Sequence, residues 1–235
     1  DLAGPARVLR EIEITMAGDT LVIDQDRGAA NWIREWFGFG RQEARVTVRV
    51  PRGTPVTVDD FAGELHIGDT DAPLEVSEAV TEGEIGDVTE ADLAFAGSSD
   101  IKVERVAGTL VLKLSGSVNA EVESAGETRV AVSGSAEVRF EDIAGGFDLV
   151  VSGSAEVSAA SVNGRVSVDI SGSGDVQIGE GRADPLLVRV AGSGVFGFGG
   201  LAVDPDLSVT GAGDIWIARH EGNLVSRGAN IRIGN

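Results

Sequence analysis

The chain of 235 residues contains no cysteine and no tyrosine, and it has only three tryptophans and two histidines. Without cysteine, neither disulfide bonds nor thiolate chemistry are available. No apolar run approaches the roughly 20 residues that a membrane-spanning helix needs. Basic residues are also scarce. The chain has 19 Lys and Arg but 38 Asp and Glu, which gives a formal net charge of −19. That charge argues against nucleic acid or an anionic membrane as a partner.

The same features of the sequence also indicate in which cellular compartment the protein is found. A chain that starts at Asp1 without a methionine is what a processed, secreted protein would look like. Together with the acidic, cysteine-free and lysine-poor composition, this predicts the periplasm or the cell surface rather than the cytosol.

Glycine, in contrast, is abundant at 33 residues, about twice the average usage. Two near-copies, ETRVAVSGSAEVRFEDIAG and GFDLVVSGSAEVSAASVNG, follow each other between Glu127 and Gly164. The glycine of this turn recurs every 17 to 20 residues, at Gly97, Gly116, Gly134, Gly153, Gly172, Gly192, Gly211 and Gly228. A short, even period of this kind indicates the coils of a solenoid.

Apolar residues hold fixed places around each of these glycines. In one copy Leu149 and Val151 precede Gly153, and Val157 and Ala159 follow it. Spacing by two is the period of a strand, so each repeat predicts two short strands with one buried face. A third inward place falls nine residues after the glycine, at Val106, Ala125, Ile143, Val162 and Leu201, with Gly181 and His220 in two copies.

A repeat of 19 residues with two or three strands leaves no room for a helix. This excludes leucine-rich and ankyrin-type repeats as well as a βαβ crossover. The fold class predicted is therefore all-β, a right-handed parallel β-helix whose coils stack about 4.8 Å apart. Glycine supplies the corners that need a positive φ.

The N-terminal residues break the pattern. Residues 1–26 predict a hairpin with its turn at Gly18 and Asp19, and residues 27–43 predict a short helix or an ordered loop. We therefore divide the chain into residues 1–44, a hairpin with a Trp-rich cap or insert, and residues 45–235, one continuous β-helix. Its first strands are expected at Val46/Val48/Val50, Val56/Val58, Leu65/Ile67 and Leu74/Val76, and its last strand at the open C-terminal edge, in ANIRIGN.

The insert has two interpretations. Trp32, Trp36, Phe37 and Phe39 form an aromatic binding patch for a protein or glycan if they are exposed. Alternatively, they fold over the N-terminal end of the solenoid and cover its core, because solenoids need terminal caps.

The strings SGSAEV, SGSGDVQIG, AGSGVFGFG and GAGDIWI, closing on RGANIRIGN, resemble the family of auto-transporter adhesins known as the head GIN domain. The upstream string VTVRVPRGTPVTVDDFAGELHIGD is similar to a related family of bacterial adhesins. Together the two resemblances span residues 45–235. They imply a bacterial envelope protein with a right-handed β-helix, and they carry over no active site.

Three residues after each glycine an acidic ladder is expected on one edge of the stack. Its members are Asp100, Glu137, Glu156, Asp175 and Asp214, with Asn119 and Val195 interrupting it. Stacked carboxylates could hold a hard cation such as Ca²⁺. The alternative is that short polar side chains bond to the turn backbone and keep the edge soluble. We favour the second interpretation and predict no metal and no cofactor.

Neither histidine suggests a catalytic site. His66 alternates outward between two apolar residues, and His220 is expected at an inward or edge position. A single histidine without cysteine or a second histidine is a poor metal site. The even repeats also lack the grouped acids, bases and aromatics of polysaccharide-cleaving β-helices.

The sequence thus favours a non-enzymatic, adhesin-like envelope protein that binds a protein or glycan through its solenoid faces. The alternative is a structural scaffold that assembles end to end, as bactofilin-like solenoids do, because an open β-helix end exposes unpaired backbone groups.

Overall fold

The computed structural model describes residues 2–3, 12–17, 20–25 and 45–234. Contacts divide the chain into two units, residues 1–51 and residues 52–235. Every regular element in the described residues is a strand.

The first unit contains two antiparallel strand pairs. β2 (Ile12–Ala17) pairs with β3 (Thr20–Gln25), which confirms the predicted hairpin. β1 (Leu2–Ala3) pairs with β4 (Arg45–Val46). The strand predicted over Val46, Val48 and Val50 was wrong beyond Val46, because β4 ends there and residues 47–50 are exposed and not in a strand. The predicted helix or loop at residues 27–43 lies outside the described residues.

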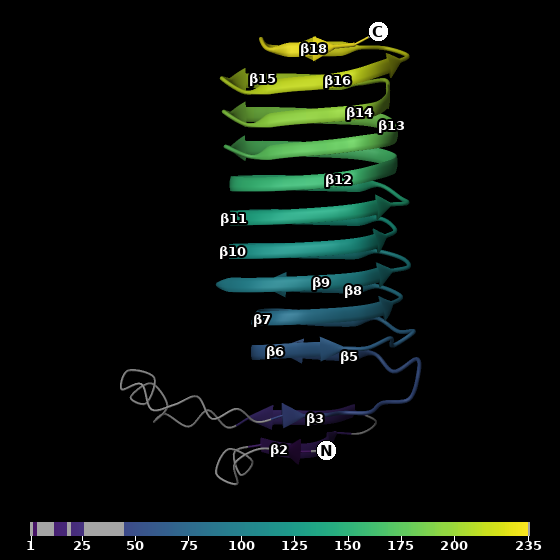
Figure 1. Ribbon diagram of the computed structural model, residues 1–235, viewed down its shortest axis with the longest axis vertical. Helices are drawn as coiled ribbons and strands as arrows, with labels where there is room; N and C mark the ends of the chain where they lie inside the picture. Colours follow the sequence, from purple (N-terminus) through teal and green to yellow (C-terminus); the bar gives the residue numbers. More distant parts are fainter. Residues whose placement is uncertain (1, 4–11, 18–19, 26–44, 235) are drawn as a thin grey trace, which may run out of the picture. The chain divides into compact units, whose positions relative to one another are not determined.

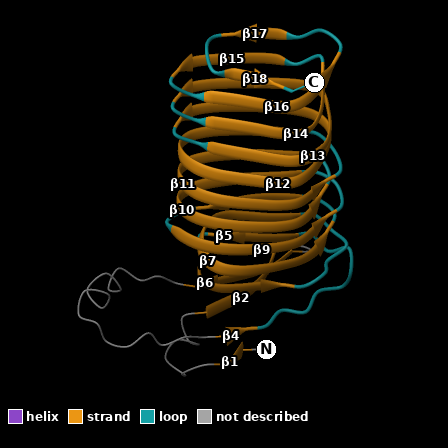
Figure 2. Cartoon of the chain, turned by 45° about the horizontal axis from the view of Figure 1, so that its top comes forward, coloured by secondary structure: helices purple, strands orange, loops and turns teal. Residues whose placement is uncertain are grey.

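The second unit is a stack of parallel coils, drawn from blue to yellow in Figure 1 and seen obliquely in Figure 2. Its strands in chain order are β5 (Val56–Asp59), β6 (Ala62–Ile67), β7 (Leu74–Val88), β8 (Ala91–Phe95), β9 (Ser98–Val106), β10 (Leu110–Ala125), β11 (Thr128–Ile143), β12 (Phe147–Gly172), β13 (Asp175–Gly192), β14 (Val195–Val203), β15 (Asp206–Gly211), β16 (Asp214–Glu221), β17 (Val225–Arg227) and β18 (Ile231–Ile233).

Each coil pairs in register with the next. Gly116 lies beside Gly134, which lies beside Gly153, and the flanking residues keep the same alignment throughout β10, β11 and β12. The unit is therefore a parallel β-solenoid of about nine turns with a period of about 19 residues, as the sequence predicts. The right-handed sense of the coil stays a prediction.

The strands do not stop at the glycine corners, as the two-strand repeat had suggested. β12 runs through both Gly153 and Gly164 over 26 residues. At the corners the ladder of backbone hydrogen bonds continues, because Ser173 N donates to Gly153 O at 3.0 Å and Ser193 N donates to Gly172 O at 2.9 Å. The corner therefore bends the strand without interrupting its pairing.

All eight predicted corner glycines have a positive φ, from +68° at Gly97 to +147° at Gly134. The predicted corner at Gly228 was nevertheless wrong in register, because this residue lies on Val209 and not on Gly211 of the preceding coil. At Gly153 the room for a side chain is as restricted as the backbone conformation. A Cβ there would lie 2.4 Å from the carbonyl oxygen of Gly134 on the neighbouring coil. The corner therefore needs glycine for both its backbone angle and its close stacking.

The core consists of the predicted inward columns, which are almost completely buried. Leu149 and Val151 are 0% exposed and Val157 is 1% exposed. The rings of Phe140 and Phe147 pack edge to face with their centroids 5.7 Å apart. Ile85 and Val88, in the acidic and irregular coil at residues 77–92, keep their expected inward places.

One predicted column was wrong in the later coils. Gly181 pairs with Val162 but is only partly buried, and the buried residue of its coil is Ala183, which pairs with Gly164. In the next coil Leu201 is likewise only partly buried, and Ala202, which pairs with Ala183, is buried. Gly181 has no side chain to fill the inward place, which Ala183 takes instead. His220 aligns with Ala202 but is exposed, so the inward alternative for this residue was wrong.

Candidate functional site: the outer faces of the solenoid

The predicted aromatic patch of Trp32, Trp36, Phe37 and Phe39 lies outside the described residues, so its two interpretations stay predictions. The described part of the chain contains Trp216, which projects from the outer face of β16 and is 45% exposed.

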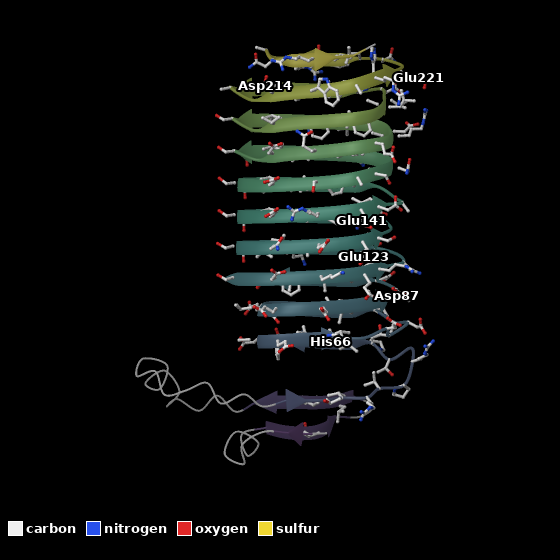
Figure 3. The ribbon with its side chains drawn as sticks, viewed as in Figure 1. His66, Asp87, Glu123, Glu141, Asp214 and Glu221 are labelled. Atoms are coloured by element: carbon white, nitrogen blue, oxygen red, sulfur yellow. The ribbon has the colours of Figure 1, made fainter. Side chains whose placement is uncertain are left out.

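The acidic column exists as a geometric feature. Glu137 aligns with Glu156, Glu156 with Asp175, Asp175 with Val195 and Val195 with Asp214. Figure 3 labels Asp214, at the C-terminal end of the column. Register extends the column to Glu82 and Glu64, which the sequence analysis missed because the early coils lack the glycine turn that served as the reference.

Several carboxylates of this column have partners on the same edge. Glu137 forms an ion pair with Arg139. Asp100 accepts a hydrogen bond from Asn119 Nδ2 at 3.4 Å, and Asp175 accepts one from Gln177 Nε2 at 3.2 Å. These partners offset part of the repulsion between stacked carboxylates, which is about 1 kcal/mol or less per pair in water. Cation binding by the column stays a prediction.

A different acidic group brings its oxygens closer together. Among the described residues, Asp69, Asp87 and Glu104 offer ligand atoms within 4.8 Å of one another. Arg105 already forms an ion pair with Asp87 at 3.5 Å, and Asp69 Oδ1 accepts a hydrogen bond from the backbone of Asp87 at 3.0 Å. The group therefore has a structural role in joining neighbouring coils.

Other charged side chains on the outer surface also form exposed pairs. His66 projects outward, as predicted, and its Nδ1 lies 3.0 Å from Glu84 Oε2. Lys102 Nζ lies 3.2 Å from Glu123 Oε1. The hydrogen bond and the negative charge of Glu123 raise the pKa of Lys102 above its ordinary value. Such exposed pairs contribute little to stability.

An open groove of about 250 Å³ lies on the outer face of four successive strands, β8, β10, β11 and β12. Two outward columns contribute to its lining: Ala94, Lys113, Ala131 and Val150 in one, and Ala96, Ser115, Ser133 and Ser152 in the other, with Glu78 beside them. Val150 is 49% exposed, although it is a large apolar residue. The strand period places these positions outward, but their small side chains give no reason to expect a groove.

The polar groups of this groove bond mainly to the solenoid itself. Ser152 Oγ donates to Val132 O at 3.3 Å, and Ser115 Oγ donates to Phe95 O at 3.4 Å. Lys113 Nζ donates to both carboxylate oxygens of Asp92 at 2.9 and 3.1 Å. The groove therefore presents apolar surface together with the hydroxyl oxygens of Ser115 and Ser152, whose protons are already donated, and with Ser133 and Glu78.

Comparison with family models gives a match over residues 122–222, from β10 to just beyond β16, to the family described as "Putative auto-transporter adhesin, head GIN domain". The resemblance to the head GIN domain family is confirmed. Searches of curated proteins and of solved structures found no match. The head GIN match includes the β11 and β12 walls of the groove.

The described residues also contain no helix that is long and apolar enough to cross a membrane.

Proposed function

We propose that this protein is a non-enzymatic module of the bacterial envelope that binds a protein or a glycan along the groove on β8, β10, β11 and β12. The observation that carries the proposal is the groove itself, an exposed apolar strip on a solenoid whose family is described as adhesin-like. The same description supports a place at the cell surface or in the periplasm.

The shape of the groove favours an extended partner. It crosses four strands on successive coils, and its volume is below the range of about 300 to 1,000 Å³ that is common for small-molecule pockets. The hydroxyl oxygens of Ser115 and Ser152 can accept hydrogen bonds, whereas their protons are donated to backbone carbonyls. A sugar chain or a peptide segment that brings hydroxyl or N–H donors fits this surface.

The arrangement supports binding rather than catalysis. A nucleophile needs a base within hydrogen-bond reach, and here the hydroxyls of Ser115 and Ser152 donate to backbone carbonyls. Lys113 is engaged by Asp92. We assign no cofactor to this site.

Replacing Val150 with arginine should abolish partner binding, because a long charged side chain would project from the β12 wall of the groove. The control is Gln177→Arg, which adds the same charge at another exposed outward position, on β13. Labelled full-length proteins are applied to arrays of purified bacterial and host polysaccharides and of extracellular matrix proteins. We expect at least one ligand whose binding falls more than tenfold with Val150→Arg and is unchanged with Gln177→Arg.

The proposal fails if no arrayed ligand binds, or if both variants bind every ligand equally well. Melting temperatures that agree with the parent protein show that each variant is folded.

A further inference from the structure

Both ends of the solenoid unit present strand edges without a partner among the described residues. At the C-terminal end β17 pairs with β15 and β18 pairs with β16, and no described strand lies on their far side (Figure 2). At the other end β5 and β6 pair with β7 alone within the described part of the chain. Unpaired edges of this kind are templates for adding another strand.

The core columns are also incompletely covered at both ends. Ile215 and Ile217 are 1% and 0% exposed, whereas Ile231 and Ile233 in the following coil are only partly buried. Leu65 and Ile67 in the first coil of this unit are likewise only partly buried. A further coil on either end would bury these side chains.

The two ends carry opposite charge, although the protein as a whole is strongly acidic. Residues 215–235 contain three arginines and one glutamate, a formal net charge of +2. Residues 52–71 contain one arginine and five acidic residues, a formal net charge of −4 with His66 neutral. The C-terminal end therefore complements the N-terminal end of another copy and not its own equivalent.

The columns show which residues would meet if one stack continued into another. The column that ends at Ile233 can be followed through Ile217 and every intervening coil to Ile67. A copy added in the same register places Leu65, His66 and Ile67 on Ile231, Arg232 and Ile233. The apolar columns then continue without a break.

Two arginines meet carboxylates in that arrangement. Arg232 lies 3.9 Å from Asp214, and Glu64 of the added copy occupies the same column as Asp214. On β17, Ser226 pairs with Leu207 of β15. The inward column of Leu207 is the one that contains Val58 of β5 at the N-terminal end. Arg227 therefore falls on Asp59 of the added copy, and it already pairs with Asp206 of the preceding coil at 2.6 Å.

We propose that copies of this protein associate head to tail, with β17 and β18 of one copy pairing with β5 and β6 of the next. Arg227–Asp59 and Arg232–Glu64 are the ion pairs that set the register. The contact is heterologous, so it propagates instead of closing as a dimer. It requires the outer edges of β5 and β6 to be accessible in the full-length chain, and it is independent of the groove.

The test is static light scattering of the full-length protein over a hundredfold range of concentration at low salt. The expected mass grows with concentration beyond that of a dimer. Arg227→Glu and Asp59→Arg should each raise the concentration needed for association at least tenfold. Arg189→Glu, which makes the same change in the column of Arg227 but within the stack, should leave association unchanged.

Mixing the two variants gives the sharpest result. Arg227→Glu keeps a normal N-terminal end and Asp59→Arg keeps a normal C-terminal end, so the mixture should associate although each variant alone does not. A constant monomer mass for the parent protein overturns the proposal. The proposal is also overturned if the mass stops growing at that of a dimer and is unchanged by Asp59→Arg. It is likewise overturned if the mixture of the two variants stays monomeric.

Discussion

Replacing Gly153 with alanine should lower the free energy of unfolding by about 2 to 5 kcal/mol. The left-handed backbone, with φ at +143°, costs about 1 to 2 kcal/mol for a residue with a Cβ. The new methyl group also lies 2.4 Å from Gly134 O and 3.0 Å from Gly134 N, which belong to the backbone of the adjacent coil. Relieving that overlap separates two coils, and overpacking of this kind costs about 1 to 3 kcal/mol.

Gly146→Ala is the matched control for this prediction. Its φ lies outside the left-handed region, and the nearest atom to an added Cβ is Arg165 O at 3.5 Å. We expect no loss and a gain of up to about 1 kcal/mol, because alanine restricts the unfolded chain. Urea unfolding followed by circular dichroism measures both variants. Equal losses for the two would show that the corner does not depend on glycine.

Replacing Phe147 with alanine should destabilise the protein by about 3 to 5 kcal/mol. The side chain is 1% exposed in the middle of the stack, and its ring packs edge to face on Phe140. Truncation leaves a cavity between coils, since backbone hydrogen bonds fix the coil spacing and prevent collapse around the gap.

The comparison for Phe147 lies three residues along the same strand. Val150 projects outward and is 49% exposed, so Val150→Ala should cost less than about 1 kcal/mol. Urea unfolding again provides the free energies. A loss below about 1 kcal/mol for Phe147→Ala would mean that this column is not part of a packed core.

The repeating geometry was predictable because it depends on local rules. A corner with a positive φ needs glycine at Gly116 or Gly153 whatever else the chain does, and alternation then places Leu149 and Val151 inward. Because each coil contacts mainly its neighbours, a pattern recognised in two copies extends to the others.

The irregular positions were not predictable because they depend on the neighbouring coil. Ala183 and not Gly181 is the buried residue of its coil, although Gly181 aligns with the buried Val162, and spacing from Gly172 does not reveal this. His220 is exposed although the matching residue one coil earlier, Ala202, is buried.

The candidate site was the least predictable part of the molecule. The groove is formed by small residues such as Ala131 and Ser133, which carry no chemical signature in a sequence. The complementarity of Arg227 and Asp59 depends on register across the whole stack, which connects residues 168 positions apart. Neither feature could be recognised before the coils were aligned.

Continuous register of the columns is the claim on which the groove and the junction both depend, and distances between spin labels test it directly. The absence of native cysteine lets labels attach only at introduced sites. Glu82 and Asp175 lie five coils apart in the acidic column, and Glu82 and Asp214 lie seven coils apart. At about 4.8 Å per coil, double electron–electron resonance on the two cysteine pairs should give distances near 24 Å and 34 Å. Distances that do not increase by about 10 Å between the two pairs would contradict the stack.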